Sequence, residues 1–236
     1  MKPDNLEAMN SGFAREQLLN LLAENSFRLG DFTLASGLKS DYYIDCRTTT
    51  LHAEGAYLTG RVFLDLFREQ GWNPYAIGGL TMGADPIVVA TSLLSSQDSP
   101  RKLVHGFLVR KAEKTHGMGR RIEGFQEKGA KVVIVDDVCT SGGSTIQAIE
   151  AAREFGFEVI GAACLVEREE AGGRGAVEKA AAPAPFISVF KSREVKAAHL
   201  KLKAASSVFA YSGSCEVCGQ PASSSSPRLR CAVHSA

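Results

Sequence analysis

Two N-terminal segments carry apolar residues at the spacing of an amphipathic helix. In residues 14–25 the apolar positions recur at i, i+4, i+7 and i+8, which predicts one buried helical face. These positions are Ala14, Leu18, Leu21 and Leu22. A second helix is expected from about Ala53 to Gly71, because glycine commonly ends a helix. Between the two helices, residues 32–47 contain two short β-prone pieces around a Ser-Gly turn.

Beyond Gly71 the sequence alternates short apolar strands with helical segments. The expected strands lie at residues 75–79, 104–110, 131–137, 158–166 and 186–190. The expected helices begin near residue 84, follow a glycine-rich turn up to residue 156, and span residues 192–204. Uninterrupted apolar strands that alternate with helices are typical of a parallel sheet covered on both faces, so the pattern predicts an α/β fold. Residues 172–185 are rich in Gly, Ala and Pro, and a loop and a frayed helix both fit them.

Composition limits the classes of protein that this chain can represent. Its 236 residues are 44% hydrophobic and 22% charged, which indicates a globular protein of one domain with an appendage. A formal net charge of +1 is too small to attract nucleic acid or an anionic membrane to the protein as a whole. No run approaches the roughly 18–20 apolar residues of a membrane span, and no signal peptide is recognisable, so a cytoplasmic protein is expected. Any bound anion must therefore be held by a local site.

The segment 132–145, VVIVDDVCTSGGST, is typical of a phosphate site at the end of a strand. A buried strand delivers Asp136 and Asp137 to its carboxyl end, the edge at which open α/β sheets bind ligands. A helix opens directly afterwards with Thr140, Ser141, Gly142, Gly143 and Ser144. Glycines allow a phosphate to approach the backbone, and the first N–H groups of a helix point at it. The carboxylates suit sugar hydroxyls or a divalent metal, so the segment predicts a sugar phosphate across a strand end.

Two other interpretations compete for this segment. A strand that ends in Asp-Asp also occurs in P-loop NTPases, but the G-x-x-x-x-G-K-[ST] loop that such proteins need is absent from the sequence. A structural strand–turn–helix, whose glycines only make a tight turn, remains an alternative for the fragment taken alone.

A hydrophobic strand followed by Asp-Asp, two residues, Thr, a small residue and Gly resembles the phosphoribosyl-pyrophosphate (PRPP) motif of the type I phosphoribosyltransferases. The blocks FTLASGLKSDYYID, GGLTMGADPI, VRKAEKTHGMG and LVEREE are similar, in order, to those of the orotate phosphoribosyltransferase family, over about residues 13–202. The resemblance implies a parallel-sheet fold with an N-terminal hood of about residues 1–50. It also implies transfer of phosphoribosyl from PRPP to orotate with Mg²⁺, giving orotidine 5′-monophosphate and pyrophosphate in pyrimidine synthesis.

The resemblance assigns roles to individual residues. Catalytic roles fall to Lys114, His116, Asp136 and Asp137. PRPP binding falls to these four and to Arg110, Lys111, Val138, Cys139, Thr140, Ser141, Gly142, Gly143 and Ser144. Orotate binding falls to Tyr43, Ile44, Thr140 and Arg168. The cations of residues 109–119, flanked by glycines, fit a mobile lid over the leaving pyrophosphate. In the family this lid reaches the neighbouring subunit, which implies a homodimer.

Two positions depart from the best-known form of the family. Ala35 and Met82 stand where lysines of the family contact PRPP, so these two cationic contacts are absent from this chain. Two other functions remain as alternatives: another PRPP-dependent phosphoribosyltransferase, and a PRPP-sensing regulator that binds nucleic acid. The small net charge and the lack of an aromatic and basic stripe argue against the regulator.

The chain changes character after about Ala204. Residues 204–236 are Ser-rich and poor in aromatic residues, so we expect a phosphoribosyltransferase domain at 1–203 and a tail at 204–236. The tail contains a Cys-x₂-Cys-x₁₂-Cys-x₂-His pattern, formed by Cys215, Cys218, Cys231 and His234. Three thiolates and an imidazole at this spacing fit a structural Zn²⁺ site, and an inert tail is the alternative.

Overall fold

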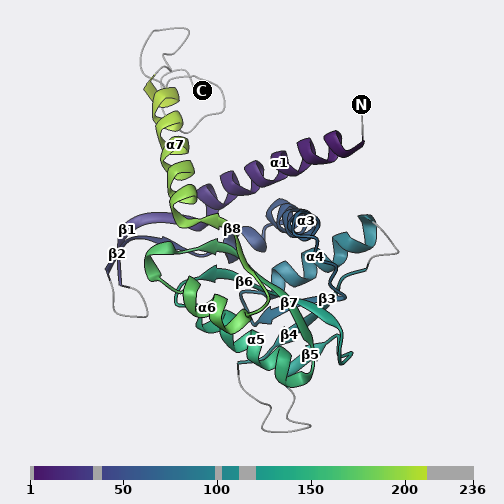
Figure 1. The fold of residues 1–236 in the computed structure, drawn as a ribbon. Helices are drawn as coiled ribbons and strands as arrows, with labels where there is room; N and C mark the ends of the chain where they lie inside the picture. The colour runs from purple at the N-terminus through teal and green to yellow at the C-terminus, as the bar shows by residue number, and fades with distance from the viewer. Residues whose placement is uncertain (1–2, 34–38, 99–102, 112–120, 212–236) are drawn as a thin grey trace, which may run out of the picture.

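A computed structural model describes residues 3–33, 39–98, 103–111 and 121–211 (Figure 1). The N-terminal elements are α1 (Pro3–Leu21), a π-helical turn (Leu22–Ser26), β1 (Phe27–Thr33), β2 (Lys39–Ile44), α2 (Arg47–Thr50) and α3 (Ala53–Glu69). The following elements are β3 (Ala76–Leu80), α4 (Asp85–Asp98), β4 (His105–Val109), β5 (Ile122–Gly124), β6 (Lys131–Cys139) and α5 (Gly143–Phe155). The last are β7 (Glu158–Glu167), a 3₁₀ turn (Glu169–Ala171), α6 (Arg174–Ala181), β8 (Phe186–Lys191) and α7 (Ser192–Tyr211).

The central sheet has six strands in the order β5-β4-β3-β6-β7-β8. Strands β3, β4, β6, β7 and β8 run parallel, and β5 is antiparallel to β4 at one edge. Helices α3 and α4 cover one face, and α5 and α6 cover the other (Figure 1). The predicted α/β fold with a parallel sheet covered on both faces is confirmed.

Strand β6 shows why the apolar pattern has no alternation. Val133 and Val135 pack into the core under α1, α3 and α4, whereas Val132 and Ile134 pack into the core under α5 and α6. All four side chains are fully buried, because successive residues of a strand point to opposite faces. A strand that is covered on both faces therefore needs apolar residues at every position.

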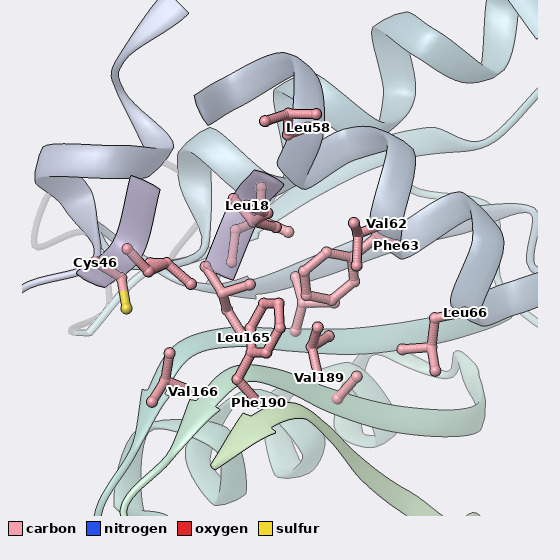
Figure 2. Close-up of a cluster of buried hydrophobic side chains, with 14 of the residues drawn as sticks. Leu18, Cys46, Leu58, Val62, Phe63, Leu66, Leu165, Val166, Val189 and Phe190 are labelled. Atoms are coloured by element: carbon pink, nitrogen blue, oxygen red, sulfur yellow. The ribbon is translucent and has the colours of Figure 1, made fainter. Parts of the chain in front are cut away.

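The N-terminal segment is attached to this sheet through the apolar cluster that also contains Val133 and Val135. Side chains of α1 and α3 meet those of β7 and β8 in one buried group (Figure 2). Strands β1 and β2 form a separate antiparallel pair. The His199 Nδ1 atom of α7 lies 2.7 Å from the Ala23 carbonyl oxygen, and the Ser26 and Thr49 hydroxyls lie 2.6 Å apart. These contacts join the π-helical turn that precedes β1 to α7 and to α2.

The carboxyl end of β7 carries a second set of contacts, between ionised groups. The Glu167 side chain is 4% exposed and accepts hydrogen bonds from Arg174 Nε at 2.9 Å and Lys191 Nζ at 2.6 Å. Burial works to raise the pKa of Glu167, but the hydrogen bonds from Arg174 and Lys191 outweigh it and lower the pKa to about 2. This carboxylate therefore joins the ends of β7 and β8 to the first turn of α6.

The predicted helices and strands are found in the structure, with differences in their bounds and in the shortest elements. The 172–185 segment contains a regular helix, α6, and β6 continues through the Asp pair to Cys139. The short elements α2 and β5 had no clear periodic signal, since they contain four and three residues. Helix α7 runs to Tyr211, so the proposed boundary after residue 203 falls inside a helix. No helix of the described residues is long and apolar enough to cross a membrane.

We expect Phe63→Ala to lower the free energy of unfolding by about 3–5 kcal/mol, because the Phe63 ring is fully buried and its loss leaves a cavity. Urea unfolding at a fixed protein concentration measures the change. The matched control is Phe13→Ala, because Phe13 is 58% exposed and its removal should cost less than about 0.5 kcal/mol. Equal unfolding midpoints for the two variants would contradict this description of the core.

Candidate functional site

A cleft of about 1360 Å³ opens beyond the carboxyl ends of β3, β6 and β7, with β2 as its opposite wall. Most of the predicted site residues line it: Tyr43, Ile44, Arg110, Lys111, Asp136, Asp137, Val138, Thr140, Ser141, Ser144 and Arg168. The predicted residues Cys139, Gly142 and Gly143 are not among the lining residues. Lys114 and His116 lie outside the described residues. The structure thus gathers the carboxylates, the hydroxyl loop and Arg168 around one cavity.

The two carboxylates leave β6 on opposite faces of the sheet. Asp136 is 5% exposed, and the Thr145 hydroxyl of α5 donates to its Oδ2 at 2.9 Å. Asp137 points toward the loop before α4, where a Cβ atom on Gly83 would lie 2.3 Å from Oδ1. Only a residue without a side chain fits beside Asp137 at this position. The pair therefore presents two differently held carboxylates to the cleft.

Both carboxyl groups have raised pKa values. Burial, reinforced by the negative charge of Asp137, raises the pKa of Asp136 to about 7. Burial also raises the pKa of Asp137, although its hydrogen bond from the Val138 N–H and the nearby Arg47 guanidinium oppose the shift. Two desolvated carboxylates at a cleft favour a cation or hydroxyl donors as ligands.

The loop between β6 and α5 is shaped for an anion. Gly142 precedes the helix with a φ of 80°, a conformation that favours glycine. A Cβ atom at this position would collide with the side chain of Val177 of α6. A Cβ atom on Gly173 would lie 2.1 Å from the Thr140 carbonyl oxygen, so α6 supports the loop from behind. No side chain caps the start of α5 at Gly142, and the first N–H groups of a helix bind anions.

Arg168 follows β7 directly, and its side chain is 5% exposed. Its Nε donates to the Tyr42 hydroxyl at 3.1 Å and to Glu170 Oε1 at 3.1 Å, and its Nη2 donates to the Ser40 hydroxyl at 3.0 Å. The guanidinium also lies 4.4 Å from the centre of the Tyr42 ring. A buried, firmly held guanidinium at a cleft is suited to a planar carboxylate.

The matches with known proteins agree with this geometry. Residues 52–183 match the phosphoribosyl transferase domain family. The orotate phosphoribosyltransferase of Aquifex aeolicus is 44% identical over 184 residues, which are 77% of this chain and 97% of that protein. The enzyme of the same name from Streptomyces avermitilis is 45% identical over 183 residues, or 77% and 96%. The chain belongs to the orotate phosphoribosyltransferase family.

A solved structure of the family shows the same fold. The crystal structure of Mycobacterium tuberculosis orotate phosphoribosyltransferase in complex with PRPP has a TM-score of 0.60 and 30% identity, and the match covers 77% of this chain and 91% of that chain. The family and the fold predicted from the sequence are therefore both confirmed.

Several cleft residues of this family member are missing from the sequence prediction. Tyr42, rather than Tyr43, contacts Arg168, because alternate residues of β2 point inward and Tyr42 and Ile44 are the buried ones. Tyr43 is 41% exposed, lies at the cleft and pairs with Phe32 at 5.6 Å between ring centres. The period-two alternation of a strand, applied to residues 39–44, was the signal that could have found Tyr42.

Other missed residues come from distant parts of the chain. Arg47 makes two hydrogen bonds to Asp45, at 2.9 and 2.8 Å, and lines the cleft beside Asp137. Ser40 and Glu170 also line the cleft, through their contacts with Arg168. Met82, which stands in place of a family lysine, is 63% exposed at the cleft and brings no charge, and Ala35 lies outside the described residues.

The metal prediction for the tail is not tested by the structure. Cys215, Cys218, Cys231 and His234 lie outside the described residues. Within the residues that are described, no group of three or more His, Cys, Asp and Glu side chains is arranged to hold a metal ion.

Asp136→Asn should raise thermal stability at pH 8 and leave it unchanged near pH 4. A carboxyl whose pKa is about 7 when folded, against about 4 when unfolded, loses its stabilising contribution as pH rises from 4 through 7. Asparagine stays neutral throughout and still accepts from Thr145, so its advantage should reach several degrees, at about 2–4 °C per kcal/mol. Melting temperatures across this pH range measure the difference.

The control for this prediction is Glu150→Gln, on the exposed face of α5. It should track the wild type at every pH. A stability difference for Asp136→Asn that does not change between pH 4 and pH 8 would show that Asp136 ionises normally in the folded protein.

Proposed function

We propose that the cleft transfers a phosphoribosyl group from PRPP to orotate, so that the protein is an orotate phosphoribosyltransferase. The supporting observation is the placement of an Asp pair, an anion loop and a buried arginine around one cavity, in a chain whose relatives carry this name. In this reaction a ring nitrogen of orotate forms a bond to the anomeric carbon of the ribose. The bond from that carbon to pyrophosphate breaks, pyrophosphate leaves with its electron pair, and the proton of the ring nitrogen passes to the departing pyrophosphate.

The ribose of PRPP would lie over the end of β6. Its 5′-phosphate would accept hydrogen bonds from the start of α5 and from Thr140, Ser141 and Ser144. The hydroxyls of the ribose would donate to Asp136 and Asp137. As pyrophosphate departs, positive charge develops on the ribose ring, and the nearby carboxylates stabilise it.

The leaving group would depart toward the rim of the cleft. Arg110 and Lys111 lie on this rim, and Arg110 Nη1 is 3.3 Å from Glu123 Oε1. We assign the remaining cationic contacts to Lys114 and His116. Mg²⁺ binds through few protein carboxylates and many phosphate oxygens, so Asp136 and Asp137 are the cleft residues that would hold it together with the substrate. When bound, the ion would neutralise charge on the pyrophosphate.

Orotate would fill the part of the cleft between β2 and Arg168. Its carboxylate would pair with the Arg168 guanidinium, and its ring would lie near Tyr43, Ile44 and Thr140. A buried cation in this place favours an anionic base over uracil, adenine or hypoxanthine. It therefore supports orotate over the other phosphoribosyltransferase substrates, and no observation on the described residues favours a nucleic-acid-binding regulator.

The decisive experiment mixes protein, Mg²⁺, PRPP and orotate and follows the loss of orotate absorbance. We expect turnover with orotate and little with adenine, hypoxanthine or uracil. Asp136→Asn combined with Asp137→Asn should lower kcat/KM by more than about tenfold without unfolding the protein, since both carboxylates serve the transition state. Turnover of another base in preference to orotate would overturn the proposal.

We further propose that the protein acts as a homodimer in the cytoplasm, joined through α3 and α4. A groove of about 520 Å³ lies between these helices. Its apolar side chains are exposed, with Leu51 at 70%, Tyr57 at 56%, Val89 at 63% and Leu93 at 59%. An apolar patch of this kind is typical of a protein interface, and a second copy of the chain would cover it.

Leu93→Asp should convert the dimer to a monomer, because it places a charge in the centre of the apolar groove. Light scattering after gel filtration should give twice the 25.2 kDa chain mass for the wild type and the single-chain mass for the variant. The control is Leu200→Asp, a 49% exposed position on α7, which should remain dimeric. A monomeric wild type, or a dimeric Leu93→Asp protein, would contradict this interface.

The division into a domain at 1–203 and a tail at 204–236 stays a proposal, and so does the structural zinc site of the tail. Elemental analysis of protein purified without added metal decides the second point. One zinc per chain supports the site, and well under one zinc per chain with no tight binding on titration supports an inert tail.

A further inference from the structure

The guanidinium of Arg168 is held along one edge only. Its hydrogen bonds to Tyr42 and Glu170 use Nε, and its hydrogen bond to Ser40 uses Nη2. Within the described part of the chain, Nη1 has no hydrogen-bond partner. The edge formed by Nη1 and Nη2 therefore keeps free donor positions at the cleft, and this edge can bind a carboxylate through two parallel hydrogen bonds.

Glu170 is itself fixed in place from three sides. Its Oε1 accepts from Arg168 Nε at 3.1 Å and from the Tyr42 hydroxyl, and its Oε2 accepts from the Ser192 hydroxyl at 3.2 Å. Burial works to raise the pKa of Glu170, but the hydrogen bonds from Tyr42 and Arg168 outweigh it and keep the pKa below its ordinary value. The carboxylate is thus ionised at neutral pH and is oriented by three hydrogen bonds, although its side chain is 50% exposed.

We propose that Glu170 is a positioning residue for substrate recognition, which orients Arg168 so that its Nη1–Nη2 edge faces the ligand carboxylate. This inference rests on the proposed function, because it assigns that carboxylate to orotate. Glu170 acts through Arg168: it occupies the Nε edge, so that an incoming planar carboxylate pairs with the other edge. It also balances the buried positive charge while the site is empty.

The location of Glu170 supports a role in positioning. It lies in the 3₁₀ turn directly after Arg168, and it links this turn to Tyr42 of β2 and Ser192 of α7. Three separate elements therefore meet at the Glu170 carboxylate. Without Glu170, Arg168 keeps Ser40 and Tyr42 as partners but loses the only ionic contact of its Nε among the described residues.

Glu170→Ala should raise KM for orotate by about tenfold, while kcat and KM for PRPP stay within about threefold of the wild type. Glu170→Gln keeps an oxygen acceptor for Nε and should recover most of the lost affinity. The matched control is Glu169→Ala, because the neighbouring Glu169 pairs with the exposed Arg193 at 3.2 Å and does not line the cleft. It should leave all three constants unchanged.

The outcomes separate this inference from the proposed function. If the wild type and Glu169→Ala do not consume orotate, the proposed function fails. If both are active and Glu170→Ala behaves like them, or if its loss falls equally on PRPP and orotate, Glu170 is not a positioning residue. Melting temperatures show whether each variant is folded. Calorimetric titration with orotidine 5′-monophosphate tests recognition in any folded variant without turnover, and unchanged affinity for Glu170→Ala would likewise reject the inference.

Discussion

The burial of β6 on both faces and along both edges is the constraint on which the cleft depends. The strand pairs with β3 on one side and with β7 on the other, and α3, α4, α5 and α6 cover its two faces. Apart from Lys131 at its amino end, this strand is exposed only near its carboxyl end, where Asp137 and Val138 are partly exposed. At that end, the pleat of the strand points the side chains of Asp136 and Asp137 to opposite faces of the sheet. The Asp136 carboxylate therefore accepts a hydrogen bond from α5, and the Asp137 carboxylate lies against the loop before α4.

Much of this architecture was predictable because its signals are local. Apolar runs identified the parallel strands, and the Asp-Asp, hydroxyl and glycine sequence identified the anion loop within a single stretch of 14 residues, 132–145. The residues around Arg168 were less accessible to such reasoning. Tyr42 meets Arg168 across 126 positions of sequence, and only the fold brings them together. The short β5 strand and α2 were missed for a related reason, since so few residues show no period.

The Arg168 side of the cleft is built differently from the side formed by the β6–α5 loop. The loop side consists of consecutive residues on a strand, a loop and a helix, packed closely on α6 through Gly173. The Arg168 side joins β2, the end of β7 and α7 through side chains alone. Under the proposed function, backbone placement sets the position of the sugar phosphate, whereas a polar network sets the orientation of the Arg168 guanidinium. Substitutions that alter selectivity between bases are therefore expected on β2 and in the 3₁₀ turn.

On acidification, Asp136 in the cleft and Glu167 at the end of β7 take up protons at very different pH values. The Glu167 carboxylate keeps its charge down to about pH 2, whereas Asp136 takes up a proton near pH 7. As acidity increases, the cleft loses negative charge while the attachment of α6 to the sheet is still intact. Under the proposed function, mild acid should therefore lower the activity reversibly, because Asp136 gains a proton while the fold is preserved.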